Sequence, residues 1–245
     1  MKQPLEALVY KHHGSNRAIP YRLLKPASLH PGSSYPLVVF LHGSGQRGVD
    51  NQAQIQAGNG AHEFMMTAAD HNFFFVAPQC PPHLTWSGVS WDHIPYQMPP
   101  RPAEPMRLAL ALVKELSKVF PVDHNRIYAT GLSMGALGMW DMVTRAPELF
   151  AAGIPICGGY DTTQAPRIRH IPFWVFHGSA DGSVPVEGSR AMVEALKECG
   201  GSPRYTEYKG AGHAIWQRTY GNSEVISWLF QQSRNSHLNK RRTNT

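Results

Sequence analysis

Three side chains of this sequence have the chemistry of a nucleophile, an acid and a base. Ser133 lies between two glycines in the pattern Gly-Leu-Ser-Met-Gly, Asp181 follows His-Gly-Ser-Ala, and His213 follows Gly-Ala-Gly. A serine hydroxyl is a weak nucleophile near neutral pH and needs a base within hydrogen-bond reach. Histidine can take that proton and return it to a leaving group, while a carboxylate fixes the imidazole tautomer. The residue types therefore predict acyl transfer through a Ser-His-Asp triad.

Each of these motifs also has a plain alternative. A lone Gly-x-Ser-x-Gly occurs by chance in many proteins, Asp181 could be a turn residue before Gly182, and His213 is one of thirteen histidines. The triad interpretation depends on all three residues following predicted strands. In a parallel sheet, ligands bind beyond the carboxyl ends of the strands. Three such loops in the order serine, aspartate, histidine favour the catalytic interpretation.

The elements that would position the three residues alternate along the chain. Apolar, β-branched and aromatic runs predict an antiparallel pair, then five strands of buried type and a sixth, alternating strand nearer an edge. These strands are expected at 5–10, 21–24, 36–41, 72–77, 126–130, 152–157, 173–176 and 203–208. Helical periodicity and caps predict helices over 105–120, after a Ser189 cap and after a Ser223 cap. This alternation predicts an α/β fold, with a mostly parallel eight-stranded sheet covered by helices on both faces.

The two glycines around Ser133 predict a sharp turn from strand to helix, because bulky neighbours would not fit there. The amide of Met134 then begins a helix and faces the place where an oxyanion would form. A second donor is expected from the glycine-rich loop after strand 36–41. The Ser44 amide is the first choice in that loop, the Gly45 amide is the alternative, and His42 is expected to brace the loop.

An irregular insert at 80–104, with six prolines and two tryptophans, interrupts the alternation. Long loops of this kind are often functional. Trp86 and Trp91 of the insert could line a substrate pocket or pack the insert onto the body. Trp216 could wall the site or brace the histidine loop, and Gln46 could contact substrate.

Composition and charge predict one α/β domain over 1–232 and a basic, disordered tail over 233–245. Residues 234–245 carry four basic residues and no acid, so most of the net charge of +6 belongs to this tail. The longest apolar runs are too short for a membrane span. No nucleic-acid partner is expected, and the pattern does not indicate an oligomeric state.

The three cysteines form no C-x-x-C pattern, so neither a metal site nor a cofactor is predicted. A disulfide between Cys80 and Cys157 stays open, with reduced thiols as the simpler interpretation. The amino terminus shows no apolar signal segment. A cytoplasmic location is therefore expected, or secretion if a leader has been removed.

About residues 5–232 resemble the α/β-hydrolase superfamily, and in particular its phospholipase/carboxylesterase-like group, some members of which are labelled predicted peptidases. Feruloyl-esterase-like and polyhydroxybutyrate-depolymerase-like proteins are relatives of that group. The resemblance is carried by Tyr-Pro-Leu-Val-Val-Phe-Leu-His-Gly-Ser-Gly-Gln-Arg-Gly from Tyr35, by Asp50-Asn51, by Ala-Pro-Gln-Cys-Pro from Ala77, and by Gly212-His213 with Trp216 and Tyr220.

The resemblance implies carboxylic ester hydrolysis without a metal, with Ser133 as nucleophile, Asp181 as acid and His213 as base. The lack of a large lid favours small-molecule esters with short-chain or aryl groups. Two alternatives stay open: amide or peptide hydrolysis by the same triad, and a non-catalytic binding protein. Parallel rates on a matched ester and amide would separate the first from esterase activity, and a fluorophosphonate label on Ser133 would exclude the second.

Overall fold

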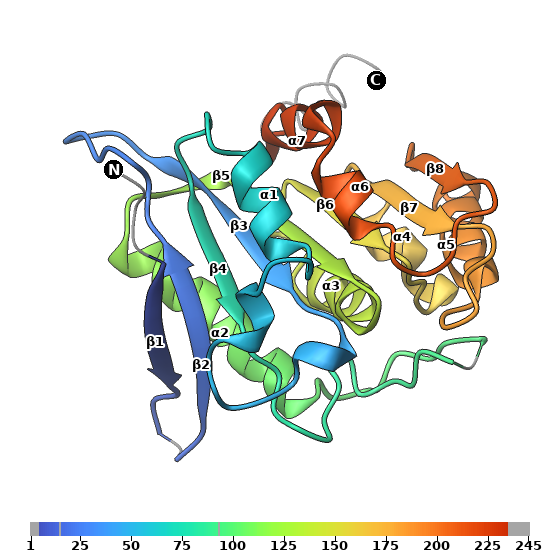
Figure 1. Cartoon of the computed structure of the whole chain (residues 1–245), viewed down its shortest axis with the longest axis horizontal. Helices are drawn as coiled ribbons and strands as arrows, with labels where there is room; N and C mark the ends of the chain where they lie inside the picture. The colour runs from blue at the N-terminus through green and yellow to red at the C-terminus, as the bar shows by residue number, and fades with distance from the viewer. Residues whose placement is uncertain (1–4, 15, 93, 235–245) are drawn as a thin grey trace.

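A twisted sheet of eight strands forms the centre of the computed structural model, which describes residues 5–14, 16–92 and 94–234 (Figure 1). The strand order is β1-β2-β4-β3-β5-β6-β7-β8. β1 and β2 are antiparallel, β2 pairs antiparallel with β4, and the other neighbours are parallel. The predicted, mostly parallel α/β architecture is confirmed. The strands are β1 (Glu6–Lys11), β2 (Ala18–Leu24), β3 (Tyr35–Leu41), β4 (Phe74–Pro78), β5 (Val122–Leu132), β6 (Ala152–Ile156), β7 (Trp174–Gly178) and β8 (Arg204–Tyr208).

Burial explains why the central strands appear as continuous apolar runs. Every residue of β3, β4, β6 and β7 is buried, because helices cover both faces of the parallel part of the sheet. The edge strands β1 and β8 have no buried residue and are only partly covered. β5 is longer than the predicted strand, since its polar first half still pairs with β3 at Tyr35.

Helices pack on the two faces in two groups. Side chains of α2, α3 and α5 join one core cluster, whereas side chains of α1, α6 and α7 join the other. Figure 1 shows α1, α6 and α7 on the near side of the sheet. The α-helices are α1 (Ala61–Thr67), α2 (Glu104–Val119), α3 (Met134–Arg145), α4 (Ala165–Ile168), α5 (Val186–Glu198), α6 (Trp216–Tyr220) and α7 (Ser223–Phe230), and the 3₁₀ helices are η1 (Ser44–Gln46), η2 (Ala53–Ile55) and η3 (Thr162–Gln164).

Both predicted serine caps need correction. α5 begins at Val186 with Pro185 at its cap position, so Ser189 lies inside the helix, where it is fully buried. The cap of α7 is Asn222, whose side chain accepts a hydrogen bond from the amide of Glu224. Serine is common at helix caps, but it is also tolerated inside a helix when its hydroxyl finds a tertiary partner.

Residues 79–103 join β4 to α2 and contain neither helix nor strand among the residues described. The contacts that fasten this insert include three from its middle and end: Trp86 Nε1 donates to the His42 carbonyl, Met98 N donates to Asp161, and Arg145 donates to the Pro99 carbonyl. Most of the predicted tail, residues 235–245, lies outside the described residues. Within the described ranges, every helix is too short or too polar to cross a bilayer.

Candidate active site

The candidate nucleophile lies on a strained turn between β5 and α3. Ser133 has φ 55° and ψ −127°, a left-handed conformation that costs a non-glycine residue free energy. A Cβ atom on Gly131 would lie 2.2 Å from the Gly135 carbonyl oxygen, and one on Gly135 would lie 2.0 Å from the Leu41 carbonyl oxygen. Both positions therefore require glycine. The turn presents the Ser133 hydroxyl beyond the carboxyl end of the sheet.

The structure brings the three predicted side chains together in a continuous chain of hydrogen bonds. His213 Nε2 lies 2.9 Å from Ser133 Oγ, and His213 Nδ1 lies 2.7 Å from Asp181 Oδ2. Because a carboxylate only accepts hydrogen bonds, Nδ1 carries the proton and Nε2 faces the hydroxyl as the acceptor. Ser133 is 5% exposed, so the residue is almost completely shielded from bulk water.

Four donors surround the Asp181 carboxylate. The amides of Ser183 and Val184 donate to Oδ1 at 2.8 and 3.0 Å, and the two histidines His213 and His177 approach Oδ2. Burial raises the pKa of Asp181, but these hydrogen bonds outweigh burial and keep the pKa well below its usual range. Asp181 is therefore charged at neutral pH and can stabilise a protonated His213.

The loop after β3 is fixed by a buried histidine beneath it. The amide of Cys80 donates to His42 Nε2 at 2.9 Å, so the ring proton lies on Nδ1, which donates to the Gly43 carbonyl at 2.6 Å. In a trans peptide the carbonyl and the following N–H point in opposite directions. The Ser44 amide therefore faces away from His42. Gly43 lies beside the nucleophile, since a Cβ on it would be 3.6 Å from Ser133 Cβ.

The Met134 amide is the other predicted donor. Met134 is the first residue of α3, and the first amides of a helix have no acceptor within the helix. Burial lowers the pKa of His42 to about 4, which keeps its ring neutral beneath the loop. A second buried side chain fastens the same loop, because Gln79 donates to the Gln46 carbonyl and to Asp50, and accepts from the amide of Asn51.

The predicted substrate-binding residues differ in exposure. Trp86 has no exposed surface and bonds the His42 carbonyl, which favours the packing interpretation over a pocket wall. Trp91 is partly exposed and lies under the Arg47 guanidinium. Trp216 donates to the Gly58 carbonyl at 2.8 Å and meets the His213 ring edge-on at 5.5 Å, so it braces the histidine loop. Gln46 Oε1 lies close to Gly43.

A thiol lies beneath the candidate base and acid. Cys157 Sγ donates to the His213 carbonyl at 3.2 Å, and its thiol lies with Asp181 and His213 in a group whose potential ligand atoms are all within 4.8 Å. Burial and the Asp181 charge raise the pKa of the Cys157 thiol, which keeps it a donor. The bond between Asp181 and His213 and the bond from Cys157 to the His213 carbonyl together account for the proximity of this group. Cys80, Cys157 and Cys199 are free thiols, so Cys80 forms no disulfide with Cys157.

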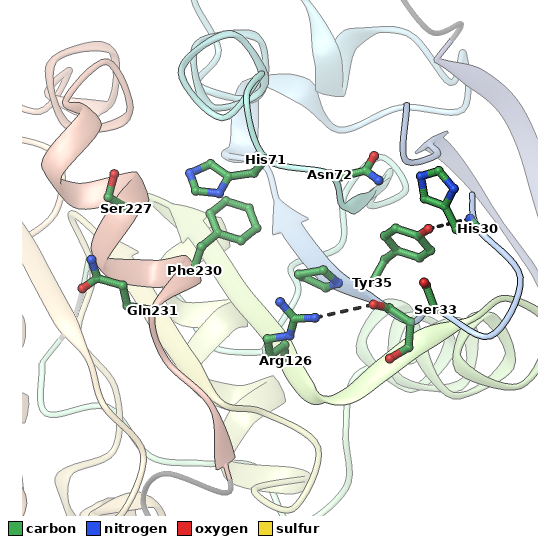
Figure 2. Close-up of a pocket in the computed structure, with 11 residues that line it drawn as sticks. His30, Ser33, Tyr35, His71, Asn72, Arg126, Ser227, Phe230 and Gln231 are labelled. Carbon is green, nitrogen blue, oxygen red and sulfur yellow. Dashed lines mark hydrogen bonds between the residues drawn. The ribbon is translucent and has the colours of Figure 1, made fainter. Parts of the chain in front are cut away.

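A hollow of about 610 Å³ lies around Tyr35 and Arg126, on the side of β3 and β5 away from the Ser133 turn (Figure 2). Its polar groups are occupied with near neighbours. Arg126 Nε pairs with Asp123 at 2.6 Å, and the Tyr35 hydroxyl accepts from the amide of His30. Figure 2 shows the His71 ring stacked on Phe230, at 4.1 Å between centroids. This hollow is thus remote from the serine, and size alone does not mark the site.

Comparison with known proteins agrees with this geometry. Residues 31–224 match the model of the phospholipase/carboxylesterase family. The chain belongs to this family. A probable carboxylesterase of rice, Oryza sativa subsp. japonica, is 25% identical over 197 residues, which cover 74% of this chain and 82% of the relative. The predicted enzyme class, a carboxylic ester hydrolase of the α/β-hydrolase type, is confirmed.

Solved structures support the same fold. The crystal structure of a thermostable esterase superposes with a TM-score of 0.86 and 44% identity, and it covers 94% of this chain. The chain spans 63% of the length of that esterase. A ferulic acid esterase superposes with a TM-score of 0.69 over 94% of this chain and 100% of its own, at 16% identity, which is a likeness of fold.

Three residues around the site were not assigned from the sequence: His177, Ser189 and Gln79. All three are fully buried polar residues whose partners lie on other segments of the chain. His177 sits in the same motif as Asp181, and a histidine at the end of an apolar strand is the one signal that could have drawn attention to it. Nothing in the local pattern indicates that Ser189 or Gln79 faces inward.

Proposed function

We propose that the chain is a serine carboxylesterase that hydrolyses short-chain or aryl esters, with Ser133 as nucleophile, His213 as base and Asp181 as acid. The observation that carries the proposal is the unbroken hydrogen-bond path from the Ser133 hydroxyl through His213 to Asp181. A hydroxyl, an imidazole in the required tautomer and a charged carboxylate together form an activated nucleophile.

The first half of the reaction forms an acyl-enzyme. Ser133 Oγ attacks the ester carbonyl carbon while its proton moves to His213 Nε2. The carbonyl oxygen takes up the negative charge and accepts hydrogen bonds from the amides of Met134 and Ser44, each of which contributes about 3 kcal/mol of barrier lowering. The tetrahedral intermediate collapses, the bond to the alcohol oxygen breaks, and the proton on His213 passes to that oxygen.

The second half repeats these steps with water in place of serine. His213 takes a proton from water, and the resulting hydroxide attacks the acyl carbon of the ester with Ser133. Collapse of the second intermediate releases the carboxylic acid and returns the proton to Ser133 Oγ. Asp181 stays ionised throughout, because four hydrogen bonds favour its charged form over its protonated form.

A small apolar pocket supports the choice of substrate. It has a volume of about 370 Å³ and is lined by insert residues 94–96, by Tyr160 and Thr162 after β6, and by the first turns of α5. The pocket borders the segment that holds the acid, because its lining residue Gly188 precedes Ser189, whose hydroxyl bonds His177, a neighbour of Asp181. A pocket near the lower end of the usual range of ligand sites accepts a ring or short chain better than a long acyl chain.

The triad is tested by covalent labelling and by substitution. A fluorophosphonate probe is expected to add one mass increment to the wild type and none to Ser133→Ala. Hydrolysis of p-nitrophenyl esters should fall by about 10⁶-fold in Ser133→Ala, with an unchanged melting temperature. Wild-type turnover by Ser133→Ala would overturn the proposal. Labelling of Ser133 with turnover of a matched anilide rather than of esters would move the assignment to an amidase.

The pocket is tested by narrowing it from α5. Ala191 is exposed at the pocket edge, so Ala191→Leu fills space without disturbing the core. The ratio of kcat/KM for methyl ferulate to that for p-nitrophenyl acetate should fall by about tenfold or more. The leucine side chain would take the place of the aryl group in the pocket, and loss of apolar contacts of this size changes specificity by that amount. Glu194→Leu, on an exposed turn of the same helix, is the matched control and should leave the ratio unchanged. Equal ratios in all three proteins would contradict this subsite.

A further inference from the structure

A second histidine contacts the candidate acid at the same carboxylate oxygen as the base. His177 lies in β7, and its side chain has no exposed surface. Its Nε2 is 3.1 Å from Asp181 Oδ2 and 3.1 Å from the Val184 carbonyl oxygen. Its Nδ1 is 2.7 Å from Ser189 Oγ. Two histidine rings thus share one oxygen of one carboxylate.

The neighbours of His177 determine where its ring proton lies. The carboxylate of Asp181 and the carbonyl of Val184 only accept hydrogen bonds, so Nε2 must be the donor. Nδ1 then accepts from the Ser189 hydroxyl. That hydroxyl has a second acceptor within reach, the Gly158 carbonyl at 3.2 Å, but Trp140 Nε1 already donates to the same carbonyl at 3.0 Å. When the Ser189 hydroxyl donates to His177 Nδ1, each of these groups has a hydrogen-bond partner.

We propose that His177 is a positioning residue for Asp181, which it holds through Oδ2 with its own tautomer fixed by Ser189. The inference rests on the proposed triad. The amides of Ser183 and Val184 fix Oδ1, and His177 fixes Oδ2 from the side that His213 leaves free. The carboxylate is thereby prevented from rotating about its last bond, and the oxygen that faces His213 stays in line with the base.

The same contact changes the charge available to the base. The shorter bond on Oδ2 belongs to His213, at 2.7 Å, and the longer to His177, at 3.1 Å. A donor from His177 disperses part of the negative charge of Oδ2, so this oxygen is less able to take the proton from His213 Nδ1 during the reaction. His213 therefore keeps the proton on Nδ1 throughout the reaction. This is required of a base that takes up and returns protons only at Nε2.

Other titratable groups near Asp181, His177 and His213 come from four further segments. Glu207 of β8 is the strand-pair neighbour of His177, and its charge, which interacts with the ring, is paired with Arg190. Cys157 directly after β6 lies beside Asp181 and His213. Burial, followed by the charges of Asp92 and Asp181, raises the pKa of Tyr96 in the insert. Ser133 faces His213 from the β5–α3 turn. Burial raises the pKa of Cys157 and of Tyr96, so both remain protonated where His213 is titrated, and neither supplies a competing charge.

The test uses His177→Leu, which keeps buried bulk but removes the donor, and His177→Gln, whose amide nitrogen is as many bonds from Cβ as Nε2 is. For His177→Leu we expect kcat for p-nitrophenyl acetate to fall by about ten- to hundredfold, because small misplacement of catalytic groups has effects of that size. KM should stay within about twofold. His177→Gln should recover most of the loss.

The pH profile distinguishes positioning from a purely structural role. With His177 removed, Oδ2 has more charge to stabilise a protonated base, so the acid limb of kcat/KM should move to higher pH by about half a unit or more. Ser189→Ala should move the limb in the same direction by less. Tyr128→Phe removes a buried hydrogen bond to the Gln232 carbonyl at the other end of the sheet, and as control it should lower only the melting temperature.

The outcomes separate this inference from the proposed function. If the acid limb of kcat/KM stays in place or moves to lower pH in both His177→Leu and Ser189→Ala, the positioning role is overturned. This holds even if the free energy of unfolding falls in these variants. If His177→Leu does not fold, the positioning role is tested with Ser189→Ala and His177→Gln alone. A wild-type pH profile of kcat/KM in Ser189→Ala then contradicts that role. If Ser133→Ala retains turnover, the triad itself fails; if Ser133→Ala is inactive and these profiles are unchanged, only the role of His177 fails.

Discussion

The sequence His-Gly occurs at the carboxyl ends of two strands, and the two histidines act differently. His42 follows β3 and His177 lies near the end of β7, and both rings are completely buried. His42 donates to a backbone carbonyl and accepts from a backbone amide. His177 instead donates toward a charged side chain and accepts from a hydroxyl.

This difference separates two ways of supporting a reaction. A ring bonded only to the backbone can fix a peptide plane, as His42 does for the peptide that contains the Ser44 amide. A ring bonded to a carboxylate can also change how much charge that carboxylate offers to its other partner. In the kinetics, loss of His42 should therefore change the rate but not its pH profile, whereas loss of His177 should change both.

Within the comparison of the two histidines, the largest expected effect comes from His42→Leu, which frees the peptide plane between Gly43 and Ser44. If the Ser44 amide turns away from the oxyanion, kcat should fall by about 10²–10³-fold, as when one oxyanion donor is lost. The acid limb of the pH profile should stay at its wild-type position. Steady-state kinetics from pH 5 to 9, roughly the range in which a histidine base titrates, would measure both quantities.

His42→Asn is the matched control for this variant. Its amide nitrogen is as many bonds from Cβ as Nδ1 is, so it can still donate to the Gly43 carbonyl and should recover most of kcat. A shift of the acid limb in His42→Leu as large as that in His177→Leu would break the comparison, because it would mean that both histidines act on the charge of the site.

The second largest effect concerns the free energy of unfolding, to which the buried His42 ring gives a dependence on pH. Burial lowers the pKa of His42 to about 4, below the value of 6.5 that applies in the unfolded chain. Between these values the unfolded chain binds a proton that the folded protein cannot, so His42 makes the free energy of unfolding decrease by about 3 kcal/mol as pH drops from 6.5 to 4. Urea unfolding at several pH values would show it.

In His42→Asn this contribution is absent. The stability difference between wild type and variant should therefore shrink by about 3 kcal/mol over the same pH interval, whatever the other groups contribute to both proteins. A difference that stays constant with pH would show that the ring takes up a proton as readily in the folded protein as in the unfolded chain, and the neutral ring assigned to His42 in this pH interval would be wrong.

The smallest effect is expected from Trp86→Phe. This change removes the indole N–H that bonds the His42 carbonyl and leaves a buried acceptor unpaired, at a cost of about 1–3 kcal/mol in the free energy of unfolding. The His42 ring keeps its own two bonds, so kcat should change by about threefold or less. A loss of kcat as large as in His42→Leu would instead make Trp86 part of the substrate site.

Sequence patterns predicted the parts of this molecule that depend on burial and on local backbone conformation. The central strands were found because residues covered on both faces must be apolar, and β3 and β6 were located to within one residue. The turn at Ser133 was found because glycine is the only residue that fits on either side of it. The eight-stranded, mostly parallel sheet followed from the alternation of strands and helices, whereas the strand order was not predicted and comes from the structure.

The parts that were missed depend on contacts between distant segments. Ser189 was taken as a helix cap, since a serine that faces a strand from inside a helix looks the same in sequence as one that begins a helix. The role of Gln79 depends on Gln46 and Asn51, more than 25 positions away. α1 was not predicted because its seven residues bury only Ala61 and Phe64, which is too short a stripe to recognise.

The close approach of Gly135 to the Leu41 carbonyl makes the reactive serine a reporter of assembly. Ser133 is held at positive φ by a helix packed directly against the end of a neighbouring strand, so the strained turn has no support until β3 lies beside β5. A partly folded chain can contain every helix and still have an unreactive hydroxyl. During refolding, the fraction of molecules that react with an active-site titrant would therefore follow completion of the central sheet, and would lag behind the recovery of helical circular dichroism.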